Sequence, residues 1–338
     1  MWLSILGERF TKFLVTMLDY NLISPTHGSI NLEPGVPKAF SNQLMRDSKV
    51  NYAEGKYGRL MLQEIELNDL RIHYNIYHIR TRFLLNVKRN IPTLMIHIVL
   101  KNDMQYHLNS IGDVYLKEGQ FNIVYLPFID STTIFEQAGE YRIFKVFFPV
   151  EFLSQYTATF PYLNEFLQQV TDSSPSLLLK EHGWINSEIS YIINQFMQCT
   201  YDEAVRKLHY DNLFRELLLL LLLQKQRDHV SGKRYMQSLY EARSIIQKNI
   251  GRNFTITEIA QQVGLNEIRL RNGFKQTFGT GVFQFMVAAK MQKAFTMILE
   301  TDKPVKEIAK LTGYTSMQNF VTAFKKYFNA TPGSLRKK

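Results

Sequence analysis

The sequence predicts an α+β fold, in which a β-rich sandwich or barrel with attached helices precedes an all-α domain. Short runs rich in Ile, Val, Tyr and Phe, separated by polar turns, fill the segment from Leu60 to Pro149 and are typical of strands. After Pro149 the apolar residues recur at helical spacing. Near the C terminus one pattern occurs twice, and such a repeat normally indicates one structural unit used twice.

The repeated pattern begins with an apolar stripe and ends with a glycine. Ile256–Gly264 returns as Val305–Gly313, at a constant offset of 49 residues. After the glycine the match resumes at an offset of 50, where Phe274–Phe278 returns as Phe324–Phe328. The two copies therefore share both their apolar positions and the place of their turn.

Each copy reads as two short helices joined by a tight turn. Apolar residues at i, i+3, i+4 and i+7 from Ile256 to Val263 mark one face of a helix. Thr255 and Glu258 form a capping box at its start, Gly264 suits its left-handed end, and Asn266 is a good N-cap for the next helix. A longer, basic second helix is typical of a helix-turn-helix.

The second copy repeats this plan with small differences. Pro304 stands where Thr255 stood, so the capping box is missing, although proline is tolerated at a helix start. Thr315 or Ser316 is the expected cap of its second helix. Between the copies, Gly281 to Glu300 predicts one helix about 30 Å long at 1.5 Å per residue. Successive major grooves on one face of DNA lie about 34 Å apart, so this helix suits two adjacent grooves.

The C-terminal hundred residues resemble a known family. The pattern from Ile308 to Arg336 resembles the signature of the AraC family of bacterial transcription regulators, and Asn266 to Phe283 is similar to its PchR-like subgroup. The resemblance implies sequence-specific binding of double-stranded DNA and activation or repression of nearby genes, with RNA polymerase as a further partner. It also implies a cupin-like N-terminal domain that senses a small-molecule effector, with a siderophore and a carbohydrate as the expected classes.

The charge distribution fits a nucleic-acid partner. Residues 234–338 hold 17 Lys and Arg against 6 Asp and Glu, whereas the first 233 residues hold 23 against 24. A near-neutral body with a basic terminal domain is the electrostatic pattern of a nucleic-acid binder. A domain for a membrane surface has the same asymmetry, but the duplicated helix pair favours DNA.

The cysteine count and the N terminus bear on location. Cys199 is the single cysteine, which leaves no intrachain disulfide and fits a reducing cytoplasm. Met1 to Tyr20 is apolar but interrupted by charges, so we expect an amphipathic helix or an upstream extension rather than a signal peptide. The leucine run Leu217 to Leu223 is too short to cross a bilayer, so no membrane partner is expected.

That leucine run requires burial on every side. Packing on the β domain covers one side, and a second subunit is favoured for the other, so we expect a homodimer. The polar segment Gln226 to Lys233 is the expected linker, followed by a first helix over Tyr240 to Ile250. The expected strands are Leu60–Leu67, Leu70–Ile79, Thr93–Lys101, Gln105–Asn109, Asp113–Leu116, Gln120–Leu126 and Tyr141–Phe148, and the expected helices before the linker are Glu151–Tyr156, Tyr162–Val170, Trp184–Met197, Tyr201–Leu208 and Asn212–Lys225.

Nothing in the sequence favours catalysis, a metal or a cofactor. A metal cupin needs a paired His-x-His with further ligands, and a DNA-repair alkyl-transfer protein needs several reactive cysteines. His73 and His78 are an odd number of residues apart, so on one strand they face opposite sides. The remaining candidates are isolated histidines and strand tyrosines, for which packing outweighs a role in a pocket; they are His97, His107, Tyr74, Tyr77, Tyr106 and Tyr125.

The outer faces of the two second helices carry the expected DNA contacts. Arg271 suits guanine, Asn272 suits adenine, Ile268 suits a thymine methyl group, and Arg269 suits a phosphate. Thr322 stands where the family usually has Arg or Lys, so the second helix is expected to add affinity more than discrimination. The expected DNA-binding residues are Ile268, Arg269, Arg271, Asn272, Lys275, Met317, Gln318, Thr322, Lys325 and Lys326.

These observations combine into four segments. The alternatives left open are an N-terminal half that serves only as a dimerisation scaffold, and a metal-cupin enzyme fused to a DNA-binding module. The segments are residues 1–52, an extension and loop-rich stretch; 53–150, the β-rich sensor; 151–233, the helical dimerisation region and linker; and 234–338, the DNA-binding domain with helix-turn-helix units at 255–279 and 304–329.

Overall fold

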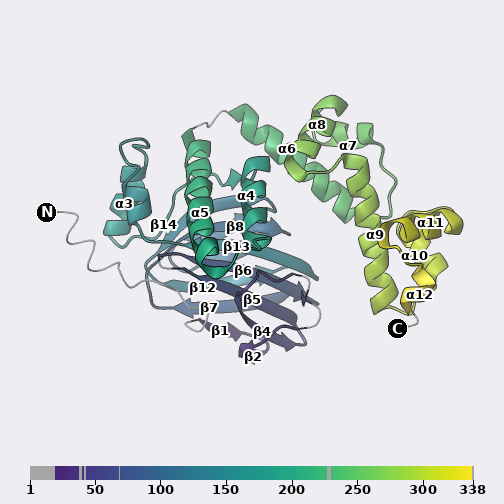
Figure 1. Ribbon diagram of the computed structural model, residues 1–338, viewed down its shortest axis with the longest axis horizontal. Helices are drawn as coiled ribbons and strands as arrows, with labels where there is room; N and C mark the ends of the chain where they lie inside the picture. Colours follow the sequence, from purple (N-terminus) through teal and green to yellow (C-terminus); the bar gives the residue numbers. More distant parts are fainter. Residues whose placement is uncertain (1–19, 38–39, 42, 68, 227–229, 337–338) are drawn as a thin grey trace. The chain divides into compact units, whose positions relative to one another are not determined.

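The computed structural model describes residues 20–336, apart from residues 38–39, 42, 68 and 227–229. The chain divides into two compact units, Met1–Asp228 and His229–Lys338. The first is β-rich with attached helices and the second is helical (Figure 1). The helix expected within Met1 to Tyr20 falls on residues 1–19, outside the described residues.

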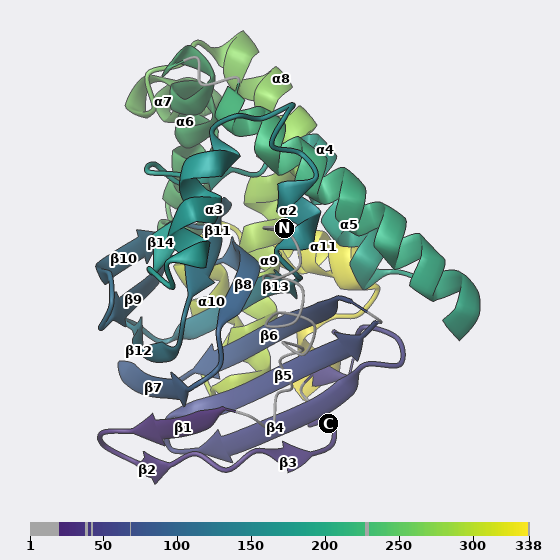
Figure 2. The same ribbon diagram turned by 90° about the vertical axis from the view of Figure 1, so that its left-hand side faces the viewer.

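The strands of the first unit form two antiparallel sheets. The described strands of the larger sheet follow the order β14-β11-β8-β13-β6-β5-β4-β3, with β15 also pairing with β11, and those of the smaller sheet the order β10-β9-β12-β7-β1-β2. In Figure 2, β4, β5 and β6 lie side by side. The strands are β1 (Asn21–Ser24), β2 (Gly28–Ser29), β3 (Glu33–Pro34), β4 (Lys49–Gly55), β5 (Gly58–Glu66), β6 (Arg71–Ile79), β7 (Phe83–Arg89), β8 (Thr93–Lys101), β9 (Met104–Leu108), β10 (Gly112–Leu116), β11 (Gln120–Leu126), β12 (Ile129–Phe135), β13 (Gly139–Phe147), β14 (Ser176–Leu177) and β15 (Gly183–Trp184).

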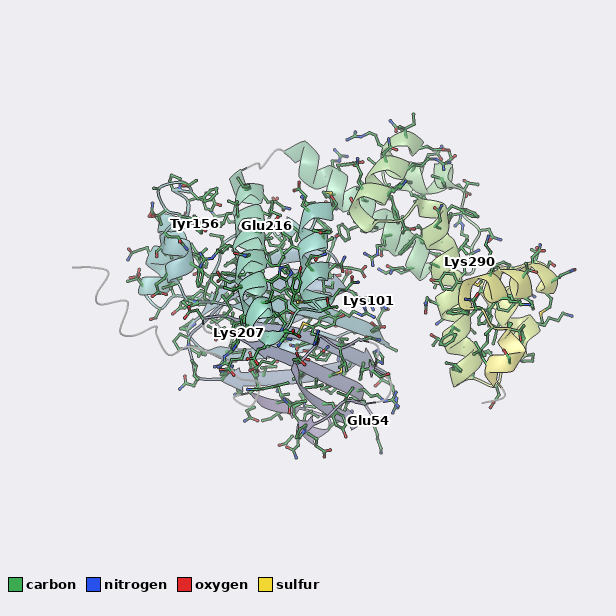
Figure 3. All side chains as sticks on the ribbon, in the orientation of Figure 1. Glu54, Lys101, Tyr156, Lys207, Glu216 and Lys290 are labelled. Atoms are coloured by element: carbon green, nitrogen blue, oxygen red, sulfur yellow. The ribbon has the colours of Figure 1, made fainter. Side chains whose placement is uncertain are left out.

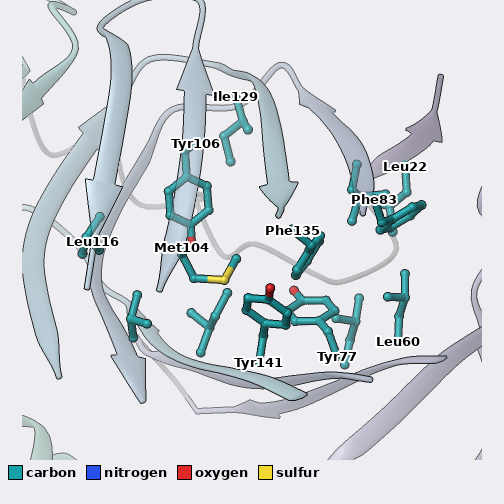
Figure 4. Close-up of a cluster of buried hydrophobic side chains, with 14 of the residues drawn as sticks. Leu22, Leu60, Tyr77, Phe83, Met104, Tyr106, Leu116, Ile129, Phe135 and Tyr141 are labelled. Atoms are coloured by element: carbon teal, nitrogen blue, oxygen red, sulfur yellow. The ribbon is translucent and has the colours of Figure 1, made fainter. Parts of the chain in front are cut away.

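One apolar core lies between the inner faces of the two sheets. Alternate residues of a strand point to the same side, so Tyr141, Ile143 and Phe147 of β13 all enter this core. Tyr77 of the larger sheet and Phe135 of the smaller one meet there, with ring centroids 5.1 Å apart (Figure 4). Burial of such side chains stabilises the fold by about 1.5–3 kcal/mol each.

Helices cover the outer face of the larger sheet. Phe144 of β13 packs on Phe196 of α4, and Phe148 packs on Phe214 of α5, with centroids 5.5 and 5.2 Å apart. Leu219 in the leucine run is 42% exposed, so in this chain the run is not buried on every side. The helices of this unit are α2 (Glu151–Ser154), α3 (Leu163–Thr171), α4 (Ser187–Met197) and α5 (Glu203–Gln226).

Several predicted elements need correction. The strands predicted at Thr93–Lys101 and Gln120–Leu126 are confirmed, but β7 and β12 were not predicted. Strands β1 and β4 begin in the segment expected to be mostly loop, and β4 pairs with β5 along its whole length. The two helices expected on either side of Tyr210 form one helix, because Tyr210 is fully buried and donates a hydrogen bond to the carbonyl oxygen of Phe196 at 2.9 Å.

The second unit contains a central helix, α9, with other helices packed against each of its halves. Helix α6 begins at Val230, inside the segment expected to be a linker and ten residues before the predicted start. Among the described residues, no helix of either unit is both long enough and apolar enough to cross a membrane. The helices are α6 (Val230–Lys248), α7 (Ile256–Gln262), α8 (Glu267–Phe278), α9 (Val282–Glu300), α10 (Val305–Leu311), α11 (Met317–Phe328) and α12 (Pro332–Arg336).

Candidate nucleic-acid interface

The first helix pair, α7 and α8, has the predicted caps. The backbone N–H of Thr255 donates to Oε2 of Glu258 at 2.7 Å, and the N–H of Glu258 donates to Oγ1 of Thr255 at 3.1 Å. Gly264, at φ 67°, takes the left-handed conformation that ends α7. The side chain of Asn266 accepts from the N–H of Arg269 at 2.8 Å and caps α8. The capping box and the Asn266 cap are therefore confirmed.

The second pair, α10 and α11, reaches the same geometry with other residues. Pro304 precedes α10 and forms no side-chain cap, as its missing hydroxyl requires. Gly313, at φ 82°, supplies the turn, and Ser316 caps α11. Helix α11 ends at Asn329 with φ 53°, whereas α8 ends at Gly279 with φ 71°. Asparagine tolerates this left-handed conformation better than most residues, which explains why Asn329 can stand where the first pair has Gly279.

The inner faces of α8 and α11 are anchored by aromatic side chains. Phe274 of α8 and Phe324 of α11, equivalent positions in the repeat, are both fully buried. In α8, a Cβ atom at Gly273 would lie 2.0 Å from the hydroxyl oxygen of Tyr235 in α6. This glycine lets α6 approach closely enough for Tyr235 to donate a hydrogen bond to the carbonyl oxygen of Arg269 at 2.8 Å.

The outer faces carry the predicted DNA-binding residues. Ile268 is 72% exposed, although it is a large apolar residue at the start of α8. The structure places the five predicted residues of each second helix on one exposed face, and their contacts with DNA stay predictions. The exposed residues are Ile268, Arg269, Arg271, Asn272 and Lys275 on α8, and Met317, Gln318, Thr322, Lys325 and Lys326 on α11.

Two of the predicted arginines have partners within the unit. Arg271 donates from Nη2 to Oε2 of Glu267 at 3.2 Å, and Glu267 also accepts from the hydroxyl of Thr257 in α7. These hydrogen bonds lower the pKa of Glu267. The guanidinium of Arg269 lies over the ring of Tyr235, 4.7 Å from its centroid. Arg269 is therefore held at the flank of the helix, where the sequence placed its phosphate contact.

Helix α9 joins the two pairs by taking part in both of their cores. Its first half, from Val282 to Ala289, packs with α6, α7 and α8. Its second half, from Met291 to Ile298, packs with α10 and α11. A single helix buried at both ends fixes the orientation of one pair relative to the other.

A second connection was not predicted from the sequence. Asn253, in the loop before α7, donates from Nδ2 to the carbonyl oxygen of Gly313 at 2.9 Å. Lys290, near the middle of α9 (Figure 3), donates to Oδ1 of Asn253 and lies 5.8 Å from the ring centroid of Tyr314. Burial lowers the pKa of Lys290. Asn253 and Gly313 are 60 residues apart, so no local pattern announces their contact.

The histidines and tyrosines of the β domain lie as follows. On β6, His73 packs on Phe147 in the inner core, whereas His78 packs on Phe40 outside it, so the predicted opposite orientation is confirmed. Tyr106 faces inward, and its hydroxyl shares a hydrogen bond of 2.8 Å with Nε2 of His97. Among the described residues, no three His, Cys, Asp or Glu side chains gather as a metal site.

Comparisons with known proteins place the helical unit. The profile of a helix-turn-helix domain matches residues 259–338. The activator CsvR of Escherichia coli is 28% identical over 127 residues, covering 36% of this chain and 47% of CsvR. The xylose operon regulatory protein of Escherichia coli (strain K12) is 26% identical over 99 residues, covering 29% of this chain and 25% of that protein.

The chain thus spans less than half the length of these two curated relatives. Among solved structures, the C-terminal domain of AraT, a response regulator from Geobacillus stearothermophilus, is 30% identical and covers 30% of this chain and 84% of that domain, with a TM-score of 0.29. Residues 259–338 therefore form a helix-turn-helix domain related to that of AraC-type regulators.

Proposed function

We propose that this chain is a sequence-specific DNA-binding transcription regulator with two helix-turn-helix units. In it, α8 and α11 enter adjacent major grooves of one duplex. The observation that carries this proposal is the pair of exposed polar faces, one on each helix, held by opposite halves of α9. Lysine and arginine on these faces neutralise phosphates, and the side chains at the start of each helix reach the base edges. Because a bacterial operator is part of the chromosome, the proposed location of this chain is the bacterial cytoplasm.

The N-terminal unit is proposed to be a cupin-like sensor of a small-molecule effector rather than an enzyme. A cavity of about 80 Å³ lies inside its two sheets and supports this role. A dimerisation scaffold without a ligand is the second candidate, and a metal-cupin enzyme is the third. Thermal-shift screening of the full chain against siderophores and sugars separates a sensor from a scaffold, and metal analysis of the purified protein tests the third candidate.

A homodimer is proposed to form through α5. Val205, Leu208 and Leu219 lie within about 60° of one another around this helix at 100° per residue. They are 52%, 70% and 42% exposed and lie on one side of α5, which also carries the exposed Arg215 and Glu216. Light scattering on the full chain tests this surface, because Leu208→Glu should dissociate the dimer. Tyr191→Ser, at a 65% exposed position on α4, is the matched control and should leave the mass unchanged.

Binding of the full chain to genomic DNA fragments tests the DNA-binding function itself. Genome-wide mapping of bound sites supplies candidate operators, and fluorescence anisotropy measures their affinity at several salt concentrations. We expect a steep fall in affinity with salt and a clear preference for mapped sites over unrelated duplexes. Affinity that is independent of salt, or equal for all sequences, would contradict the proposal.

A further inference from the structure

A row of polar side chains crosses the inner face of the larger sheet. The strand register pairs His73 of β6 with Lys145 of β13, Lys145 with His97 of β8, and His97 with Asn122 of β11. All of these residues point to the same side as the apolar core residues of their strands. Polar groups in such a position are costly unless they have partners. The row therefore needs an explanation.

The other members of the row have polar neighbours within the protein. His97 shares a hydrogen bond of 2.8 Å with Tyr106, and Asn122 donates to the carbonyl oxygen of Leu179 at 2.8 Å. His73 lies 3.4 Å from Oε2 of Glu64, a carboxylate at the edge of the row that is also held by Arg71. These contacts leave Lys145 as the exception, because its amine has no hydrogen bond or ion pair within the described part of the chain.

The side chain of Lys145 lines the cavity between the sheets. Burial alone lowers the pKa of this amine to about 8, so at neutral pH it is still mostly charged. Burial also lowers the pKa of His97 well below its ordinary value, which keeps that ring neutral. Among the described residues, the lining contains no Asp or Glu, and Lys145 is its one charged side chain.

The rest of the lining is mainly apolar, with a few hydroxyl groups. Tyr106, Leu116 and Ile129 project into the interior (Figure 4), and the β12 residues Ser131 and Thr133 add their hydroxyls. A volume of about 80 Å³ holds on the order of six water-sized groups. The space suits a short aliphatic body better than a neutral sugar, whose many hydroxyls require many polar partners.

We propose that this cavity binds a small organic carboxylate, with the ammonium group of Lys145 as its counter-ion and the apolar lining around its body. This assignment rests on the proposed sensor function and names its class of effector. In an apolar site, an ion pair replaces the missing partner of the amine and is stronger than it is in water. Tyr106, Ser131 and Thr133 supply hydroxyls for a second carboxylate oxygen or for a polar substituent.

Calorimetry on the full chain tests the proposal, with propanoate and butanoate as probes and propan-1-ol and butan-1-ol as their neutral counterparts. We expect saturable binding of at least one carboxylate and much weaker binding of its alcohol. Lys145→Met should reduce the affinity for the carboxylate about 10-fold to 100-fold, the usual effect of losing a hydrogen bond to a charged group, without changing that for the alcohol. Lys101→Met, at a lysine paired with Glu140 at 3.0 Å, is the matched control.

Other outcomes overturn it. Equal binding of acids and alcohols, unchanged binding in Lys145→Met, or no saturable binding of either carboxylate would each do so. Ser131→Leu fills the cavity from the opposite sheet and should abolish binding of both classes, which checks the location independently of Lys145. Anisotropy with operator DNA on the same samples, without probe, separates a failure of this assignment from a failure of the DNA-binding function.

Discussion

Asn253 donates a hydrogen bond from Nδ2 to the carbonyl oxygen of Gly313 at 2.9 Å, and so links the loop before α7 to the turn between α10 and α11. At the same point, a Cβ atom on Gly313 would lie 2.7 Å from the carbonyl oxygen of Gly251. The two helix pairs are therefore held together by this contact between a loop and a turn as well as through α9. This second connection adds to the restraint that α9 places on the orientation of one pair relative to the other.

Asn253→Ala should weaken DNA binding without unfolding either helix pair. The lost hydrogen bonds are exposed, so we expect operator affinity to fall about threefold to tenfold, in keeping with about 1 kcal/mol per bond. The variant should also tolerate an extra base pair between the two half-sites better than the wild type. Asn249→Ala removes a bond of 2.8 Å within one helix and is the control. An equal loss of operator affinity in both variants would show that the contact between Asn253 and Gly313 has no role in DNA binding.

Arg271 and Lys275 should differ in what they contribute to DNA binding. Arg271→Ala is expected to cost about 1–3 kcal/mol at one base pair and to relax the preference there. Lys275→Ala should weaken all sequences alike and reduce the salt dependence by about one unit. Binding assays over a library of single-base operator variants distinguish the two. If specific binding is unchanged in Arg271→Ala, the assigned face of α8 is wrong.

The helical unit was largely predictable because its signals are local. The capping box of Thr255 and Glu258, the turn at Gly264 and the buried Phe274 each follow from residues within a few positions of one another. The start of α6 was missed because Asp228, Ser231 and Gly232 suggest a loop. Gly273 was missed as well, since its importance comes from the approach of Tyr235 on another helix.

The β unit was less predictable because its pattern depends on distant partners. Strand β12 alternates between buried and less buried residues along its whole length, but two of its inward positions are Ser131 and Thr133. They line the cavity, so the polar residues that hid the strand are part of the candidate binding site. Lys145 was missed for the same reason, since an inward lysine looks like a surface residue until its strand is placed.

The caps of the two helix pairs make a reciprocal prediction. Thr255→Ala removes the capping box and should destabilise the start of α7 by about 1 kcal/mol. Amide hydrogen exchange at the start of α7 should therefore become about fivefold faster. Pro304→Thr should stabilise the start of α10 and slow amide exchange there, because Glu307 already stands where a capping box needs its carboxylate. Hydrogen-exchange mass spectrometry on the full chain reports both peptides. Faster exchange in α10 of Pro304→Thr would mean that the rigidity of proline outweighs the cap.

Lys145→Met should stabilise the ligand-free protein at neutral pH. The pKa of this amine is about 8 in the folded chain and its ordinary value is 10.5, so between these values the unfolded chain binds more protons and wild-type stability rises with pH. The cost of burying the charge, up to about 3 kcal/mol, is fully present below pH 8 and disappears above about 10.5.

The advantage of Lys145→Met in urea unfolding should therefore be largest at pH 7 and shrink towards pH 10.5. Three of the groups facing the amine do not titrate in this window, because burial lowers the pKa of His73 and His97 and raises that of Tyr106. Lys101→Met, on the same sheet, should show no such change. A constant difference between Lys145→Met and wild type across this range would mean that the amine finds a partner in solution, and the case for a carboxylate effector would lose its main support.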